Sequence, residues 1–169
     1  MTAPSDGLFG ALMAYREDVF RICLGFSRNA ADAEDLCHDV FLKAFTRAED
    51  LREPAGMRIW LIRIARTTCL DHHRRLRRRP IVPMEAAPDP ISEAPGPESA
   101  EEADELRNRL KEVIQALPRC QREILVLREY GGLSYEDLAR TLKLRPGTVM
   151  SRLSRARKAV VAAMEGGMS

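Results

Sequence analysis

The segment at residues 80–98 constrains the fold more than any other, because it contains six prolines. Proline lacks the backbone donor that a helix interior needs, and it also restricts the residue before it. Structureless loops longer than about 15 residues are uncommon inside compact domains. The segment therefore predicts a flexible, Pro-rich linker between two folded blocks, residues 1–79 and 99–169. A long surface loop within a single domain is the alternative interpretation.

The first block has the periodicity of amphipathic helices, with apolar residues recurring at spacings of three and four. One stripe runs from Leu8 to Phe26, and a second follows Asp32 as far as Phe45. A third begins near Trp60, after Pro and Gly interrupt the pattern at residues 49–57, and it ends in a basic run at 72–79. These patterns predict helices throughout. Trp60 could stack on a nucleic-acid base, but its place in an apolar stripe favours a core position.

The second block continues the helical pattern from Leu106 to Leu127. Pro118 suits the first position of a helix, and Gly131-Gly132 suit its end. Ser134 can then cap the next helix, with Asp137 three residues further on. Residues 133–158 thus predict two short helices joined by a tight turn, the second with a basic face. This is the pattern of a helix-turn-helix, which places side chains in the DNA major groove.

Charge is distributed unevenly along the chain. Residues 1–79 hold 14 Lys/Arg and 11 Asp/Glu, residues 80–105 hold eight acids and no bases, and residues 106–169 hold 13 bases and six acids. Two basic blocks around an acidic linker favour contact with nucleic acid. No apolar run approaches the roughly 20 residues of a membrane span, and the N-terminus lacks a signal-peptide pattern. We therefore expect a cytoplasmic protein without membrane insertion, its cysteines reduced.

The sequence offers little for catalysis or metal binding. It has no Gly-rich phosphate loop, nucleophile elbow or paired-carboxylate signature, so we expect no enzyme activity, no catalytic residue and no cofactor. Cys69, His72 and His73 have the helical spacing of two metal ligands, but a structural zinc site needs about four. No metal site is therefore expected.

Two sets of motifs resemble a known family. The first resembles region 2 of a bacterial RNA polymerase sigma factor of the extracytoplasmic-function (ECF) subfamily and comprises Asp32–Phe45, Trp60–Arg66 and Leu70-Asp71. The second is similar to region 4 and comprises Leu117–Arg128, Gly132–Ala139 and Gly147–Arg157. Together they cover nearly everything except the linker and the extreme termini. The resemblance implies an all-α protein of two small helical domains.

The resemblance also implies partners and site residues. The second domain would recognise the −35 promoter element, and the first would bind core RNA polymerase and help to melt the −10 element. An anti-sigma partner, which can hold the protein at the membrane, is also implied. The implied −35 contacts are Arg128, Arg145, Thr148, Ser151, Arg152 and Arg155. The implied −10 contacts are Arg52, Arg58, Arg63 and Arg66. The implied polymerase contacts are Asp35, Leu36, Asp39 and Lys43.

One position departs from the family pattern: Met150 stands where Lys or Arg commonly follows the Gly-Thr-Val motif. The −35 sequence that this chain recognises is therefore expected to differ from the usual one. Two other functional classes remain as alternatives. One is a stand-alone helix-turn-helix regulator, which would have no need of the first block's motifs. The other is an interaction protein whose helix-turn-helix no longer binds DNA.

Overall fold

The computed structural model describes residues 6–27, 29–78 and 98–166. Every regular element within these ranges is a helix, which confirms the all-α prediction for the described part of the chain. The predicted linker, apart from Glu98, lies outside the described residues, and so does Arg79. None of the helices in the described ranges is both long enough and apolar enough to cross a bilayer.

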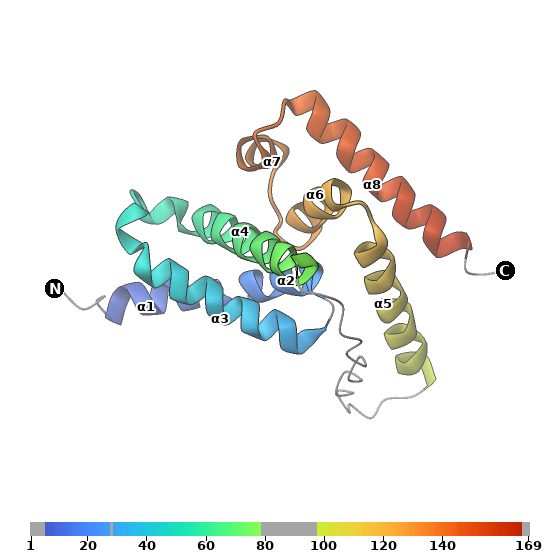
Figure 1. The fold of residues 1–169 in the computed structure, drawn as a ribbon, viewed down its shortest axis with the longest axis horizontal. Coiled ribbons are helices and arrows are strands. Elements are labelled where there is room, and N and C mark those ends of the chain that lie inside the picture. Colours follow the sequence, from blue (N-terminus) through green and yellow to red (C-terminus); the bar gives the residue numbers. More distant parts are fainter. Residues whose placement is uncertain (1–5, 28, 79–97, 167–169) are drawn as a thin grey trace.

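The first domain is a bundle of α1 (Asp6–Met13), α2 (Arg16–Phe26), α3 (Ala30–Thr46) and α4 (Met57–Arg78) (Figure 1). Two 3₁₀ turns, η1 (Ala48–Asp50) and η2 (Pro54–Gly56), connect α3 to α4. Helices α2, α3 and α4 each pack against the other two. Their apolar stripes meet in a core that includes Val19, Ile22, Val40, Leu61 and Ala65, all fully buried.

The stripe expected from Leu8 to Phe26 is divided between two helices, α1 and α2. The chain turns at Ala14–Tyr15, where the Tyr15 amide donates to the carbonyl of Leu12 at 3.1 Å. No Pro or Gly marks this turn, so local sequence could not reveal it. Tertiary packing decides the break: α1 leaves the line of α2, and its Phe9 ring stacks on Phe45 of α3 with centroids 5.6 Å apart.

The second domain contains α5 (Glu98–Ala116), α6 (Arg119–Glu129), α7 (Tyr135–Leu142) and α8 (Pro146–Gly166). Gly132 ends the α6 segment with φ of +62°, a conformation that favours glycine, as the Gly-Gly pair predicts. The sequence predicted Pro118 as the first residue of a helix. In the structure Pro118 lies one residue before the helix. Its ψ of 141° is extended, so α6 begins at Arg119.

Two helices begin with side-chain caps. Asn29 Oδ1 accepts from the amide of Asp32 at 2.7 Å at the start of α3. Ser134 Oγ accepts from the amide of Asp137 at 3.1 Å at the start of α7, which confirms the predicted cap. Each cap satisfies a backbone donor that has no partner within its helix, and such caps typically contribute about 1 kcal/mol.

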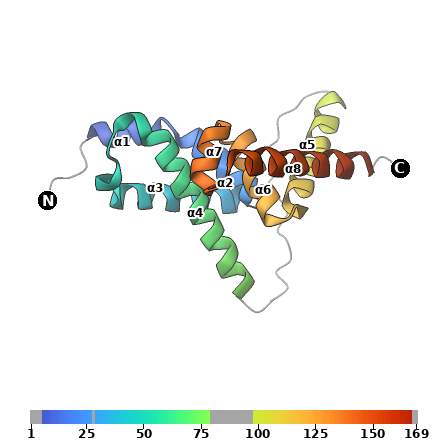
Figure 2. The same ribbon diagram turned by 90° about the horizontal axis from the view of Figure 1, so that it is seen from above.

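The two domains pack against each other, with α2 of the first lying beside α5 and α6 of the second (Figures 1 and 2). Gly25 permits a close approach of the two domains, because a Cβ atom there would lie 2.8 Å from Val126 Cγ1. Beside it, Gln115 Nε2 donates to the carbonyls of Gly25 at 3.1 Å and Ser27 at 2.7 Å. Backbone of one domain is thus bound by a side chain of the other.

Candidate nucleic-acid interface

The inner face of α8 fixes the helix-turn-helix. Val149, Leu153 and Ala156 are buried, and α8 packs on both α6 and α7. The turn before α8 is tight because Lys143 adopts a left-handed conformation with φ of 53°. The Leu144 amide then donates to the carbonyl of Ala139 at 2.9 Å. These contacts fix which face of α8 is directed outward.

The outer face of α8 carries most of the residues expected at the −35 element. Ser151 and Arg155 are exposed, Thr148 and Arg152 are half-buried, and Arg145 is exposed in the turn before the helix. Met150 lies among them with 59% of its surface exposed. Polar and basic side chains on the N-terminal part of an exposed second helix are what a major-groove contact requires.

Arg128 differs from this group, because its side chain is engaged within the domain. Its Nη1 donates to the carbonyl of Leu133 at 2.6 Å, and its guanidinium lies 5.2 Å from the centre of the Tyr135 ring. Both contacts hold the connection between α6 and α7. In this arrangement Arg128 stabilises the helix-turn-helix, whereas the resemblance implied a contact with the −35 element.

Three of the four arginines expected at the −10 element bind the second domain instead. Arg58 pairs with Asp18 at 2.9 Å and donates through Nη2 to the carbonyl of Gly131 at 2.5 Å. Arg63 Nε lies 3.5 Å from Thr141 Oγ1, at the limit of a hydrogen bond. The fourth, Arg52, is exposed in the segment before η2.

The strongest of these interdomain contacts is the ion pair between Arg66 and Glu123. Arg66 Nε lies 2.5 Å from Glu123 Oε1, and the two side chains are only 24% and 10% exposed. Removing one partner of a buried pair leaves the other charge uncompensated. Glu123 is not among the site residues expected from the sequence. The available signal was an acidic residue directly before the apolar run Ile124–Leu127, but nothing local identified Arg66 as its partner.

The residues expected to contact the polymerase divide in two. Asp35 and Asp39 are exposed on α3, as a docking surface requires. Leu36 is only 3% exposed and belongs to the core, so its side chain cannot contact a partner directly in this arrangement. Lys43 Nζ donates to Thr68 Oγ1 at 3.1 Å and so connects α3 with α4. Trp60 is half-buried and packs against the core, the position that its apolar stripe favoured.

Three cysteines lie in the first domain's core. Cys23 and Cys69 are buried with their sulfur atoms 3.9 Å apart. The hydrogen bond to Cys69, together with burial, raises the pKa of the Cys23 thiol far above its usual range. Burial raises the pKa of Cys37 to about 12. Within the described ranges, His, Cys, Asp and Glu side chains form no cluster of three or more suited to a metal. His73 Nε2 instead donates to the carbonyl of Phe26 at 2.7 Å.

We predict that a thiol reagent at pH 8 modifies Cys120 rapidly and the three buried thiols slowly. Cys120 is exposed, whereas the other three thiols are buried and inaccessible to the reagent. Mass spectrometry of alkylated peptides over time would measure this. Equal rates at all four positions would contradict it.

The raised pKa values of Cys23 and Cys37 also predict that the folded protein is less stable at alkaline pH. Above about pH 9 these two thiols lose their protons in the unfolded chain but retain them in the folded one.

Comparison with known proteins relates this geometry to a family. The family description Sigma-70 region 2 matches residues 11–79, and Sigma-70, region 4 matches residues 107–160. The RNA polymerase sigma-H factor of Pseudomonas aeruginosa is 32% identical over 162 residues, which cover 91% of this chain and 84% of that protein. The chain belongs to the ECF branch of the sigma-70 family. It is a sigma factor, a non-enzymatic subunit that directs promoter-specific transcription initiation by RNA polymerase.

Other sigma factors agree with this assignment. The ECF sigma-E factor of Escherichia coli K12 is 32% identical over 139 residues, 78% of this chain and 73% of that protein. SigE of Mycolicibacterium smegmatis is 34% identical over 148 residues, but these span only 56% of its length. Family membership excludes the stand-alone regulator as the alternative function.

Two solved structures share the fold at 23% identity. The sigma factor RpoE of Bartonella quintana, in complex with the anti-sigma factor NepR, aligns with a TM-score of 0.68 over 94% of each chain. CnrH, in complex with the cytosolic domain of CnrY, aligns with a TM-score of 0.70 over 96% of this chain and 91% of that one. These alignments include both helical domains, so the fold of the sigma factor is shared across its length.

Proposed function

We propose that the outer face of α8 recognises the −35 element of the promoters that this sigma factor serves. The observation that carries the proposal is the group of exposed Ser151 and Arg155 with half-buried Arg152, on a helix whose opposite face is buried. The guanidinium group of arginine can donate two hydrogen bonds to guanine, one to O6 and one to N7. Arg145 and Thr148 are placed at the start of α8 for contacts with phosphates, which orient the protein without selecting sequence.

The −10 element is assigned to the first domain, through Arg52, Arg58, Arg63 and Arg66. Three of these guanidinium groups contact the second domain in the packed arrangement. They can bind DNA only if those contacts are replaced, so the proposal requires the domains to separate on the promoter. Residues 1–79 and 99–169 would then act as separate modules joined by the linker at 80–98.

Core polymerase is proposed to dock on the exposed surface of α3. Asp35 and Asp39 are exposed there, and Leu42 beside them has 51% of its surface exposed. An apolar side chain flanked by acids suits a partner helix with basic and apolar residues. Leu36 and Lys43 would then contribute by holding α3 in place, because one is in the core and the other bonds to Thr68.

We also propose an anti-sigma partner for this chain. The support is that both structural neighbours were solved with such a partner, NepR in one case and CnrY in the other. A partner of this kind would hold the sigma factor in the cytoplasm or at the membrane until polymerase can bind it.

Purified protein added to sigma-free core polymerase is expected to give promoter-dependent transcripts from sites in its own genome. Transcript start sites would be mapped by sequencing the RNA ends, with core polymerase alone as the control. Aligned start sites should share one −35 and one −10 sequence at constant spacing. Transcripts that start at random, or only at the level of core polymerase alone, would refute the assignment.

A further inference from the structure

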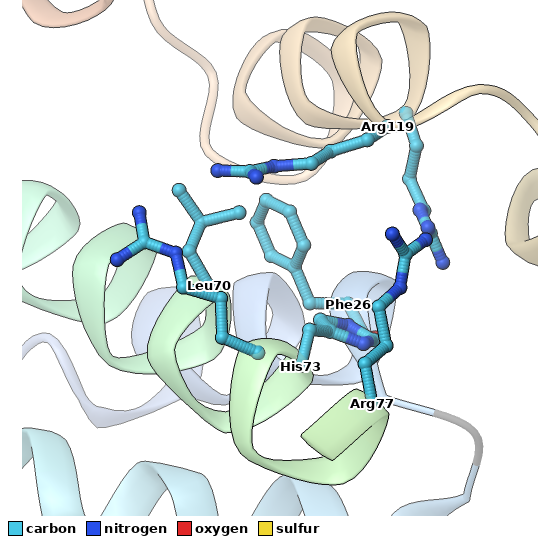
Figure 3. A pocket seen from close by; sticks show the side chains of 7 residues that line it. Phe26, Leu70, His73, Arg77 and Arg119 are labelled. Carbon is cyan, nitrogen blue, oxygen red and sulfur yellow. The ribbon is translucent and has the colours of Figure 1, made fainter.

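A small pocket of about 50 Å³ lies where the two domains meet. Its walls come from both domains: α4 contributes the basic residues His73, Arg74 and Arg77, and α6 contributes Arg119 and Arg122. Phe26 of α2 also lines it, and Arg77 of α4 and Arg119 of α6 extend toward each other beside that ring (Figure 3). Four guanidinium groups therefore line one hollow that neither domain forms alone.

Among the described residues, two arginines of this pocket have no carboxylate partner. Arg74 pairs with Asp71 at 3.2 Å, and Arg122 Nη1 donates to the amide oxygen of Gln115 at 2.8 Å. Neither Arg77 nor Arg119 has an ion pair with any carboxylate in the described ranges. Guanidinium groups directed toward one another repel, so an anion placed among them would lower the energy of the packed arrangement.

The start of α6 adds to the positive potential in the pocket. Arg119 is the first residue of the helix, Pro118 supplies no side-chain cap, and the first turn contains no acidic residue. The positive end of the helix dipole is therefore uncompensated, and helix starts of this kind favour anions. The helix dipole and the guanidinium groups of both domains thus all favour an anion at the same place.

From this geometry we infer a binding site for a small phosphorylated anion at the domain junction, held by Arg77, Arg119 and their neighbours. The guanidinium fork matches phosphate oxygens in geometry and charge. Arg77 and Arg119 are exposed, so each single contact is weak and a ligand must make several at once. A diphosphate should therefore bind more tightly than orthophosphate, and chloride should bind weakly.

The site couples its ligand to the packing of the domains. Because its walls come from α4 and α6, an anion bound by both walls stabilises the packed arrangement and not the separated one. This consequence follows from the location of the pocket alone, and it holds whether or not α8 recognises the −35 element.

Inorganic pyrophosphate is the probe for the test, titrated into the full-length protein by calorimetry at constant ionic strength. We expect one site, and we expect Arg77→Gln and Arg119→Gln each to weaken binding about tenfold, the loss of one charge-assisted hydrogen bond. The matched control is Arg75→Gln, an exposed arginine of the same helix that does not line the pocket. It should change the affinity less than twofold, and circular dichroism should show all three variants folded.

Three outcomes would overturn the inference. One is that all variants bind pyrophosphate with the same affinity. A second is that chloride competes for the site as well as phosphate compounds do. Both results would indicate diffuse attraction of anions to a basic surface. The third is pyrophosphate binding that loosens the domains, measured as an increased radius of gyration in small-angle scattering.

Discussion

Replacing Arg152 and Arg155 together with alanine is expected to abolish promoter-dependent transcription while leaving the protein folded. Arg155 is exposed and Arg152 is half-buried, and neither belongs to the buried face formed by Val149, Leu153 and Ala156. A well-placed contact between arginine and a base contributes about 1–3 kcal/mol, so loss of two should lower promoter affinity about 100-fold or more. Transcript yield with core polymerase would measure the effect, alongside promoter binding at several salt concentrations.

The matched control for this double variant is Arg107→Ala. Arg107 lies on α5, is exposed and, among the described residues, pairs with the nearby Asp104, so its loss removes a charge that lies outside α8. Binding to core polymerase should be unchanged in both proteins, because the proposed docking surface is on α3. If the double variant retained transcription within a fewfold of wild type, α8 would not be the −35 contact.

Replacing Gly25 with alanine is expected to separate the two domains. The new Cβ would lie 2.8 Å and 2.9 Å from the two γ-carbons of Val126, closer than carbon atoms can approach. Val126 is fully buried, so it has little room to move. Alanine is also up to about 1 kcal/mol more favourable than glycine in a helix, so α2 itself should not be weakened. The clash should therefore disrupt the interface while leaving the first domain intact.

Small-angle scattering would detect the separation as an increased radius of gyration. Separation should also free Arg58, Arg63 and Arg66, and thereby increase the affinity for −10 single strands several-fold. Gly10→Ala is the control, since nothing lies within 4 Å of a Cβ at that position. Adding Val126→Ala to Gly25→Ala removes the clashing carbons and should restore compactness, as in a double-mutant cycle. A single variant that stays compact would contradict the predicted separation. A variant that separates but binds DNA with unchanged affinity would show that the interface does not mask these arginines.

Much of the local structure could be predicted from neighbouring residues. The helix-turn-helix followed from the Ser134 cap, the Gly131-Gly132 stop and the apolar positions of α8, because each depends on residues within one or two turns. The exposed face of α8 followed from the same periodicity. The division of the first stripe at Ala14–Tyr15 did not, because stacking of Phe9 on Phe45 is a long-range contact without a local signal.

The sequence by itself determined the fold class, the family and the exposed face of α8, since helical periodicity and capping are local properties. Only the tertiary structure decided where the first domain's arginines are directed. Arg66 pairs with Glu123, which lies 57 residues later in the chain. Arg58 donates to the carbonyl of Gly131, which lies 73 residues later. Such pairings depend on how two separately folded bundles meet, which periodicity within either bundle does not encode. The same junction brings Arg77 and Arg119 to one pocket, although neither residue has a local feature that indicates the other.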